Sequence, residues 1–166
     1  MKMPVWLTLA LVLMPAAAGG QPAPLSTAQS ERAARALSAW LEAEVFDPSE
    51  LQPLIQYGQA VVPSLIVALD AGPSPARRER QRRLLDAEHD MLQEQARNTP
   101  GRKLPSKTDY VNHYTANFEA LYRVRAAQAL AAIGGAEARK ALEAAAGKTG
   151  RDDVRSAIQE SLKQFK

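Results

Sequence analysis

YRVRAAQALAAI (residues 122–133) and VRSAIQESLKQF (residues 154–165) are two copies of one helical pattern at a constant offset of 32 residues (154 − 122). The equivalent pairs are Tyr122/Val154, Arg123/Arg155, Ala126/Ile158, Ala129/Ser161, Leu130/Leu162 and Ile133/Phe165. Between the copies, Gly134-Gly135 interrupts the pattern, and an Ala- and Leu-rich segment, residues 136–146, ends at Gly147. The pattern predicts a unit of helix, turn and helix, which must stack on a neighbour to bury its apolar face.

A third, weaker copy lies upstream. Gly58, Leu65 and Ala68 match Gly135, Leu142 and Ala145 at one offset of 77 residues (135 − 58). This offset is not a multiple of 32, so we expect either irregular spacing or an insertion between the first unit and the second.

These positions resemble the HEAT-like repeats of bacteria, including the bilin-lyase type. In that family an apolar residue precedes an Arg, small residues make the helix contacts, and a Gly turn leads to a second helix with a central Leu. The matching residues here are Tyr122-Arg123, Ala126, Ala129-Leu130, Gly134-Gly135 and Leu142. The resemblance covers residues 47–71 and 122–165. It implies an all-α fold, a short right-handed α-solenoid of HEAT-like helix pairs. It does not carry pigment-lyase activity to this chain.

The first residues have the form of a targeting segment. Lys2 is followed by an apolar run of ten residues, 5–14, and by small residues at 15–20. Ten residues are too few to span a bilayer as a helix, which needs about 20. We therefore expect a signal peptide at 1–20, a linker at 21–25, no transmembrane anchor, and export to the periplasm or the medium; the alternative is a buried N-terminal helix. The chain has no cysteine, which excludes disulfides, thiol catalysis and thiolate metal sites.

Residues 26–166 are predicted to form the HEAT-like repeat domain. Ser26 and Gln29 fit a capping box for a helix reaching about Phe46. A second helix follows Asp47 and ends at Gly58, and a third spans about 61–71. The side chains predicted to face inward from the first and third helices are Ala33, Leu37, Trp40, Leu41, Val45, Val62, Leu65, Ile66 and Leu69.

Residues 75–121 are predicted to form an elongated helical hairpin inserted after the first unit. Its first helix spans about 75–97, a polar loop covers 98–107, and the second helix spans about 109–133. Tyr110, Tyr114, Phe118 and Tyr122 recur every four residues and therefore share one helix face. Two interpretations stay open: the column packs against Leu84, Leu85, Met91 and Leu92, or it is exposed and binds a partner or a second copy.

The hairpin begins with a basic run of Arg77, Arg78, Arg80, Arg82 and Arg83. One interpretation is a solvated helix, neutralised in part by Asp86, Glu88 and Asp90. The other is a site for an anionic partner, such as an envelope polymer or lipid head groups, because guanidinium binds phosphate and carboxylate in a bidentate manner.

Composition and motifs argue against catalysis and against nucleic-acid binding. The net charge is only +3, with a pI of about 9.3, and no base-reading module is present. The two histidines, His89 and His113, with Asp86 and Asp90 suggest at most a weak metal site. We assign no catalytic, cofactor-binding or metal-ligating residue and no cofactor. The sequence favours a non-catalytic scaffold or adaptor, in the bacterial envelope or secreted, that binds another protein; its partner-binding candidates are the five arginines, Tyr110 and Tyr114. The alternative is an electrostatic binder of an anionic lipid or polymer.

Overall fold

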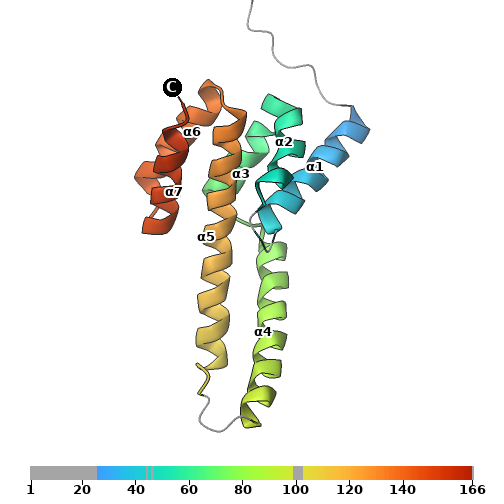
Figure 1. Ribbon diagram of the computed structural model, residues 1–166, viewed down its shortest axis with the longest axis vertical. Helices are drawn as coiled ribbons and strands as arrows, with labels where there is room; N and C mark the ends of the chain where they lie inside the picture. Colours follow the sequence, from blue (N-terminus) through green and yellow to red (C-terminus); the bar gives the residue numbers. More distant parts are fainter. Residues whose placement is uncertain (1–25, 44, 46, 99–102, 166) are drawn as a thin grey trace, which may run out of the picture.

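The computed structural model describes residues 26–43, 45, 47–98 and 103–165. The predicted signal peptide and linker, Phe46 and Lys166 lie outside these residues. The described part is all-helical and contains no strand. Its elements in chain order are α1 (Thr27–Glu42), the short 3-10 helix η1 (Pro48–Leu51), α2 (Gln52–Tyr57), the 3-10 helix η2 (Gly58–Val61), α3 (Val62–Ala71), α4 (Pro75–Arg97), α5 (Lys107–Ile133), α6 (Ala136–Lys148) and α7 (Asp152–Leu162) (Figure 1).

Local signals in the sequence set the start of several helices. The Ser26 hydroxyl accepts from the Gln29 amide at 3.3 Å while the Ser26 amide donates to the Gln29 side chain at 3.0 Å, which confirms the capping box. Asp47 accepts from the Ser49 amide at 2.8 Å and begins η1. Ser106 accepts from the Asp109 amide at 3.1 Å and begins α5.

Helix α1 is shorter than predicted. It ends at Glu42, because Ala43 leaves the helical region with φ −56° and ψ 135°. Beyond that point helical spacing no longer places side chains, and Val45 is 75% exposed. The prediction that Val45 faces inward is therefore wrong, while Ala33, Trp40 and Leu41 are buried as expected.

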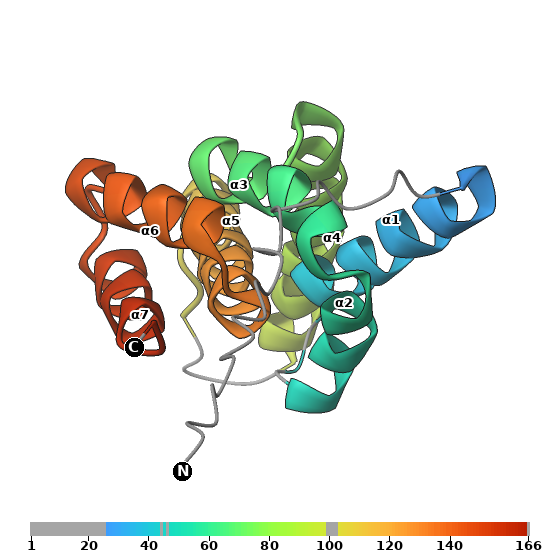
Figure 2. The ribbon, with the colours of Figure 1, turned by 90° about the horizontal axis from the view of Figure 1, so that it is seen from above.

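Helix α5 is the central element of the fold. It packs against α3, α4 and α7 and also contacts α1, α2 and α6, with α6 and α7 on one side and α1 and α2 on the other (Figures 1 and 2). Its C-terminal half carries a run of fully buried small residues and one leucine: Ala126, Ala127, Ala129 and Leu130. Small side chains let neighbouring helices approach closely, so the core is built on alanine more than on aromatic residues.

Several of the repeated positions share a backbone conformation or a degree of burial. Gly58 and Gly135 both have positive φ, at 51° and 94°, and Leu65 and Leu142 are both fully buried. In the 32-residue repeat, Ala126 and Ile158 are both fully buried, but Leu162 is only half-buried whereas Leu130 is fully buried. Helix α5 contacts both α2 and α7, and α3 contacts α6, so successive units lie against each other.

The hairpin predicted from the sequence is present. Helix α4 and the N-terminal half of α5 lie antiparallel and project away from the other helices (Figure 1). With 27 residues, α5 is about 40 Å long, so it belongs to both the hairpin and the core. The hairpin and the other helices are thus one continuous structure, joined through α5.

One segment of the described residues, Pro48–Ala71, is long and apolar enough to cross a membrane by length and composition. It turns at Gly58, where φ is positive, and it contributes Leu54, Val62 and Leu65 to the core. Of its most apolar stretch, 33% is buried in the protein.

Candidate functional site

Two pairs of adjacent apolar residues on α4 face different surroundings. Leu85 is 5% exposed and lies within the hairpin, whereas Leu84 is 59% exposed. Seven residues later, Leu92 is half-buried and Met91 is 61% exposed. Because adjacent helical residues point about 100° apart, one member of each pair packs toward α5 and the other is left on the surface. The prediction that Leu84 and Met91 pack against the aromatic column is therefore wrong.

The exposed members of these pairs line a groove between α4 and α5. Its apolar wall is completed by Tyr114, Phe118 and Leu121 of α5, and its end near the core is bordered by Leu41 and Glu42 of α1 and by the following Ala43. The groove has a volume of 790 Å³. Among the described residues, the large apolar side chains that are exposed are Val45, Val67, Leu84, Met91, Tyr114 and Leu121, and the last four line this groove.

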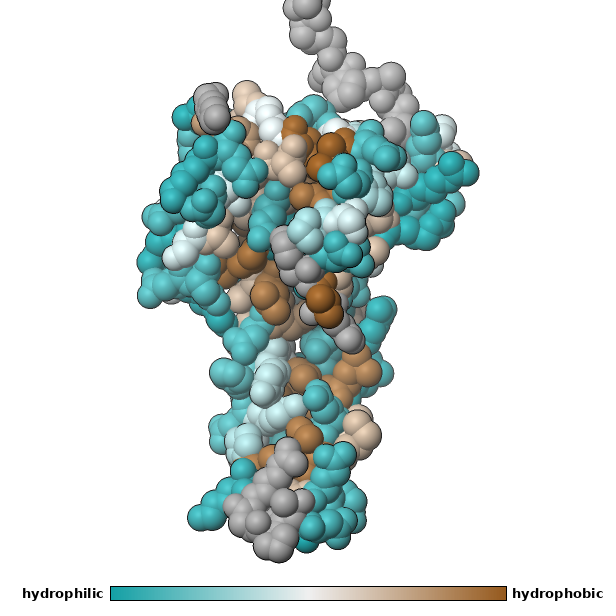
Figure 3. Space-filling model, viewed as in Figure 1, coloured by the Kyte–Doolittle hydropathy of each residue, from teal (hydrophilic) through white to brown (hydrophobic). Residues whose placement is uncertain are grey.

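The apolar surface continues toward the tip of the hairpin. A second cavity of 630 Å³ is lined by Leu92, Leu104, Pro105 and Tyr110, and it shares Glu88 and Tyr114 with the first. Figure 3 shows apolar residues along the length of the hairpin, bordered by hydrophilic ones. We call the two cavities together the hairpin groove.

The aromatic column of α5 is divided between packing and exposure. Tyr110 and Tyr122 are buried, Phe118 is half-buried, and Tyr114 is exposed. The ring of Tyr110 lies 5.3 Å from that of His89 and 4.5 Å from that of Tyr114. Burial, together with the charge of Glu88, raises the pKa of Tyr110 above its usual range. Packing thus accounts for Tyr110 and Tyr122, and Tyr114 is the aromatic side chain of the column that the groove presents to solvent.

Arg77 joins the base of the hairpin to the core. Its guanidinium donates to the Tyr122 hydroxyl and to the Ser38 hydroxyl at 3.0 Å, and it pairs with Glu42 at 3.1 Å. Nearby, the Trp40 indole donates to the Arg125 carbonyl at 2.9 Å. Desolvation lowers the pKa of the buried Arg125 below its usual range. These contacts hold the end of α1 against the head of the groove.

The other arginines of the run are divided among several partners. Arg78 pairs with Glu119 at 3.2 Å, and Arg82 donates to Asn112 at 3.0 Å, so both lie along α5. Arg83 pairs with Glu79 at 3.3 Å, and Arg80 reaches Glu42 only at 4.0 Å. Arg80 and Arg83 are the most exposed of the paired arginines, with side chains 70% and 76% exposed.

The acidic residues expected to neutralise the arginines have another partner. Asp86 and Asp90 lie 3.1 Å and 2.9 Å from the Lys107 ammonium, across the hairpin. These contacts raise the pKa of Lys107, with the Asp90 hydrogen bond as the largest cause. The predicted neutralisation by Asp86 and Asp90 is therefore wrong, because Lys107 begins α5 beside the acidic half of α4.

The suggested metal cluster does not form. His89 is buried, with its Nε2 atom 3.1 Å from the Pro105 carbonyl oxygen, while Asp86 and Asp90 point to Lys107. His113 instead lies 3.1 Å from the Asn117 side chain. In the part of the chain that the structure describes, no three His, Cys, Asp or Glu side chains are placed to hold a metal ion.

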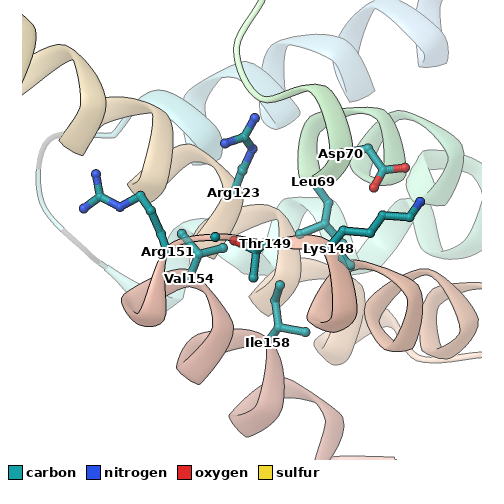
Figure 4. A pocket seen from close by; sticks show the side chains of 10 residues that line it. Leu69, Asp70, Arg123, Lys148, Thr149, Arg151, Val154 and Ile158 are labelled. Atoms are coloured by element: carbon teal, nitrogen blue, oxygen red, sulfur yellow. The ribbon is translucent and has the colours of Figure 1, made fainter.

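A smaller cavity of 260 Å³ lies between α3, α5 and the link from α6 to α7. Arg123, Lys148 and Arg151 line it, but their charged ends point in different directions (Figure 4). Arg151 pairs with Asp153 at 2.7 Å, which raises the pKa of Arg151 and lowers that of Asp153. The cations do not converge on one point, so the hairpin groove is the stronger candidate.

Neither protein-family models, nor curated proteins, nor solved structures give a match to this chain. The candidate site therefore rests on the geometry alone. The sequence predictions included Tyr114 and missed Leu84, Met91 and Leu121 as surface residues. The signal that could have drawn attention to two of them is the pair of apolar doublets, because adjacent residues point about 100° apart and cannot pack equally against one neighbouring helix.

Proposed function

We propose that this protein is an exported, non-catalytic protein-binding module, a short right-handed solenoid of HEAT-like helix pairs, with the hairpin groove as its binding surface. The observation that supports the binding surface is the set of exposed apolar side chains, Leu84, Met91, Tyr114 and Leu121, along one groove. Exposed apolar surface that is contiguous and has a polar rim is typical of interaction sites. The positive φ shared by Gly58 and Gly135 and the full burial of both Leu65 and Leu142 support the repeat architecture.

The spacing along α4 favours a helical ligand. The residues of α4 that line the groove include Arg77, Gln81, Leu84, Glu88 and Met91, at alternating intervals of four and three. This is the spacing of a coiled-coil seam, in which each side chain fits between those of a facing helix. Two antiparallel helices with an apolar groove between them form an incomplete bundle, and a further helix about 8 to 10 Å away would complete it.

Affinity capture with groove variants tests the proposal. The bait is the chain beginning at Gln21, incubated with envelope extract and washed at about 0.3 M salt, which screens exposed charges. We expect a specific protein to be retained by the unmodified bait and lost with the double variant Leu84→Glu/Leu121→Glu. The control is Val67→Glu, which introduces one glutamate at an exposed apolar residue of α3, outside the groove, and is compared with each single groove variant as well. Equal retention by the groove variant and the control would refute the groove as the binding surface.

A second function is favoured by the exposure of two arginines. Arg80 and Arg83 lie on one side of α4 and border a shallow cavity with Ala76 and Leu84. They could bind an anionic lipid or polymer. If so, Arg80→Glu/Arg83→Glu should abolish cosedimentation with vesicles containing an anionic lipid, whereas Leu84→Ala should not. Cosedimentation that is unchanged in the charge-reversed variant would exclude this function.

A further inference from the structure

Helix α4 is divided by charge into two halves. Residues 75–85 contain five arginines and one glutamate, a net charge of +4 (5 − 1). Residues 86–97 contain Asp86, Glu88, Asp90, Glu94 and Arg97, a net charge of −3 (1 − 4, His89 neutral). Asp86 and Asp90 pair with Lys107, and Arg77 and Arg78 pair with Glu42 and Glu119, which leaves Arg80, Arg82 and Arg83 in the first half and Glu88 and Glu94 in the second. Charge therefore favours an antiparallel second copy over a parallel one, which would place like charges side by side.

The lining of the groove is divided by charge in the same way as α4. Arg77 and Arg80 line its end near the core, and Glu88 lies nearer the tip. An occupying helix should therefore be apolar on one face, acidic where it meets Arg80 and basic where it meets Glu88. Helix α4 has these properties itself: Leu84 and Met91 are exposed on it, Arg80 precedes Leu84 by four residues, and Glu88 follows Leu84 by four.

We propose that the occupant of the hairpin groove is the hairpin of a second copy of this chain, with the two α4 helices antiparallel. This rests on the proposed function, since it names the partner of that site. A two-fold axis beside Leu84 brings the two Leu84 side chains together and places Arg80 of each copy beside Glu88 of the other. The contact is isologous, as in most homodimers, and the four helices form one bundle. It buries Met91, Tyr114 and Leu121, which a single copy leaves exposed.

The two-fold symmetry allows a charge-swap test whose result is specific to pairing between two copies of this chain. In Arg80→Glu, both interfacial contacts become acid against acid, and in Glu88→Arg both become cation against cation. In an equal mixture, the carboxylate introduced at position 80 meets the guanidinium introduced at position 88, and native Glu88 of one copy meets native Arg80 of the other. We expect each variant alone to dimerise at least tenfold more weakly than the unmodified protein, and the mixture to regain most of that loss as a heterodimer.

Sedimentation equilibrium on the purified protein measures both effects, with the melting curve of each variant as the check on folding. Leu84→Glu should also weaken the dimer, and Val67→Glu should leave it unchanged. A monomer at all concentrations up to about 1 mM would overturn the proposal, as would a dimer that Arg80→Glu and Glu88→Arg leave intact or a mixture that recovers nothing. If the protein is monomeric but captures another protein through Leu84 and Leu121, self-pairing is wrong and the proposed function stands. If neither occurs, both are wrong.

Discussion

Leu84 and Leu85 are neighbours on α4, and replacing each in turn by alanine should have very different effects on the free energy of unfolding. Leu85 is 5% exposed, and truncating a leucine buried to this extent costs about 2 to 5 kcal/mol, part of it from the cavity that remains. Leu84 is 59% exposed, so only about two-fifths of the 1.5 to 3 kcal/mol that full burial of a leucine contributes is at stake. The slightly better helix propensity of alanine offsets part of this loss, which leaves about 1 kcal/mol or less.

Urea unfolding followed by circular dichroism at low protein concentration measures both values on the monomer. Low concentration matters because pairing of two hairpins would bury Leu84 and add to its apparent contribution. A loss of about 3 kcal/mol at Leu85 corresponds to a fall in Tm of about 6 to 12 °C for a chain of this size. Equal losses at the two positions, or a larger loss at Leu84, would refute the orientation of α4 and with it the groove.

Three further predictions concern the rest of the fold. Gly135→Val should lower the free energy of unfolding by more than about 1 kcal/mol, because φ is +94° there, whereas Gly147→Ala, in open space within α6, should be neutral or stabilising in the same urea titration. Leu142→Ala should cost about 2 to 5 kcal/mol and Leu162→Ala less, since Leu162 is only half-buried; a similar loss at both in thermal melts would contradict the difference in burial. Burial raises the pKa of Tyr122 above 10.0, so the stabilisation that its neutral phenol provides is complete below pH 10 and is lost as the pH rises further. Tyr122→Phe should therefore flatten the decline in the free energy of unfolding above about pH 10, and an unchanged slope would count against this assignment.

The repeat predicts an all-α chain, and the close contacts between its helices explain why alanine is so frequent. Ala126, Ala127 and Ala129 are buried on α5 where it meets its neighbours, so larger side chains at these positions would push the helices apart. The same requirement explains why a small residue, Ser161, is buried in α7 at the position equivalent to Ala129. The proposed interaction surface, by contrast, is formed mainly by the hairpin.

The limits of most helices were predictable because their causes are local. The capping box at Ser26, the Asp47 cap, the positive φ of Gly58 and Gly134 and the Ser106 cap each act within a few residues of the helix end that they set. The long hairpin was predictable for the same reason, since residues 75–97 contain no internal breaker after Pro75.

The sequence by itself determined the helices, the repeat and the hairpin; only the tertiary structure decided which side of the hairpin is exposed and what the arginines contact. The two members of an apolar doublet point about 100° apart, and which of them is exposed depends on how α4 is rotated against α5. The partners of Arg77 and Arg78, Glu42 and Glu119, lie 35 and 41 residues away (77 − 42, 119 − 78), and no local signal connects them. Side-chain pairing over such separations is set by the packing of whole helices, which is where the groove arises.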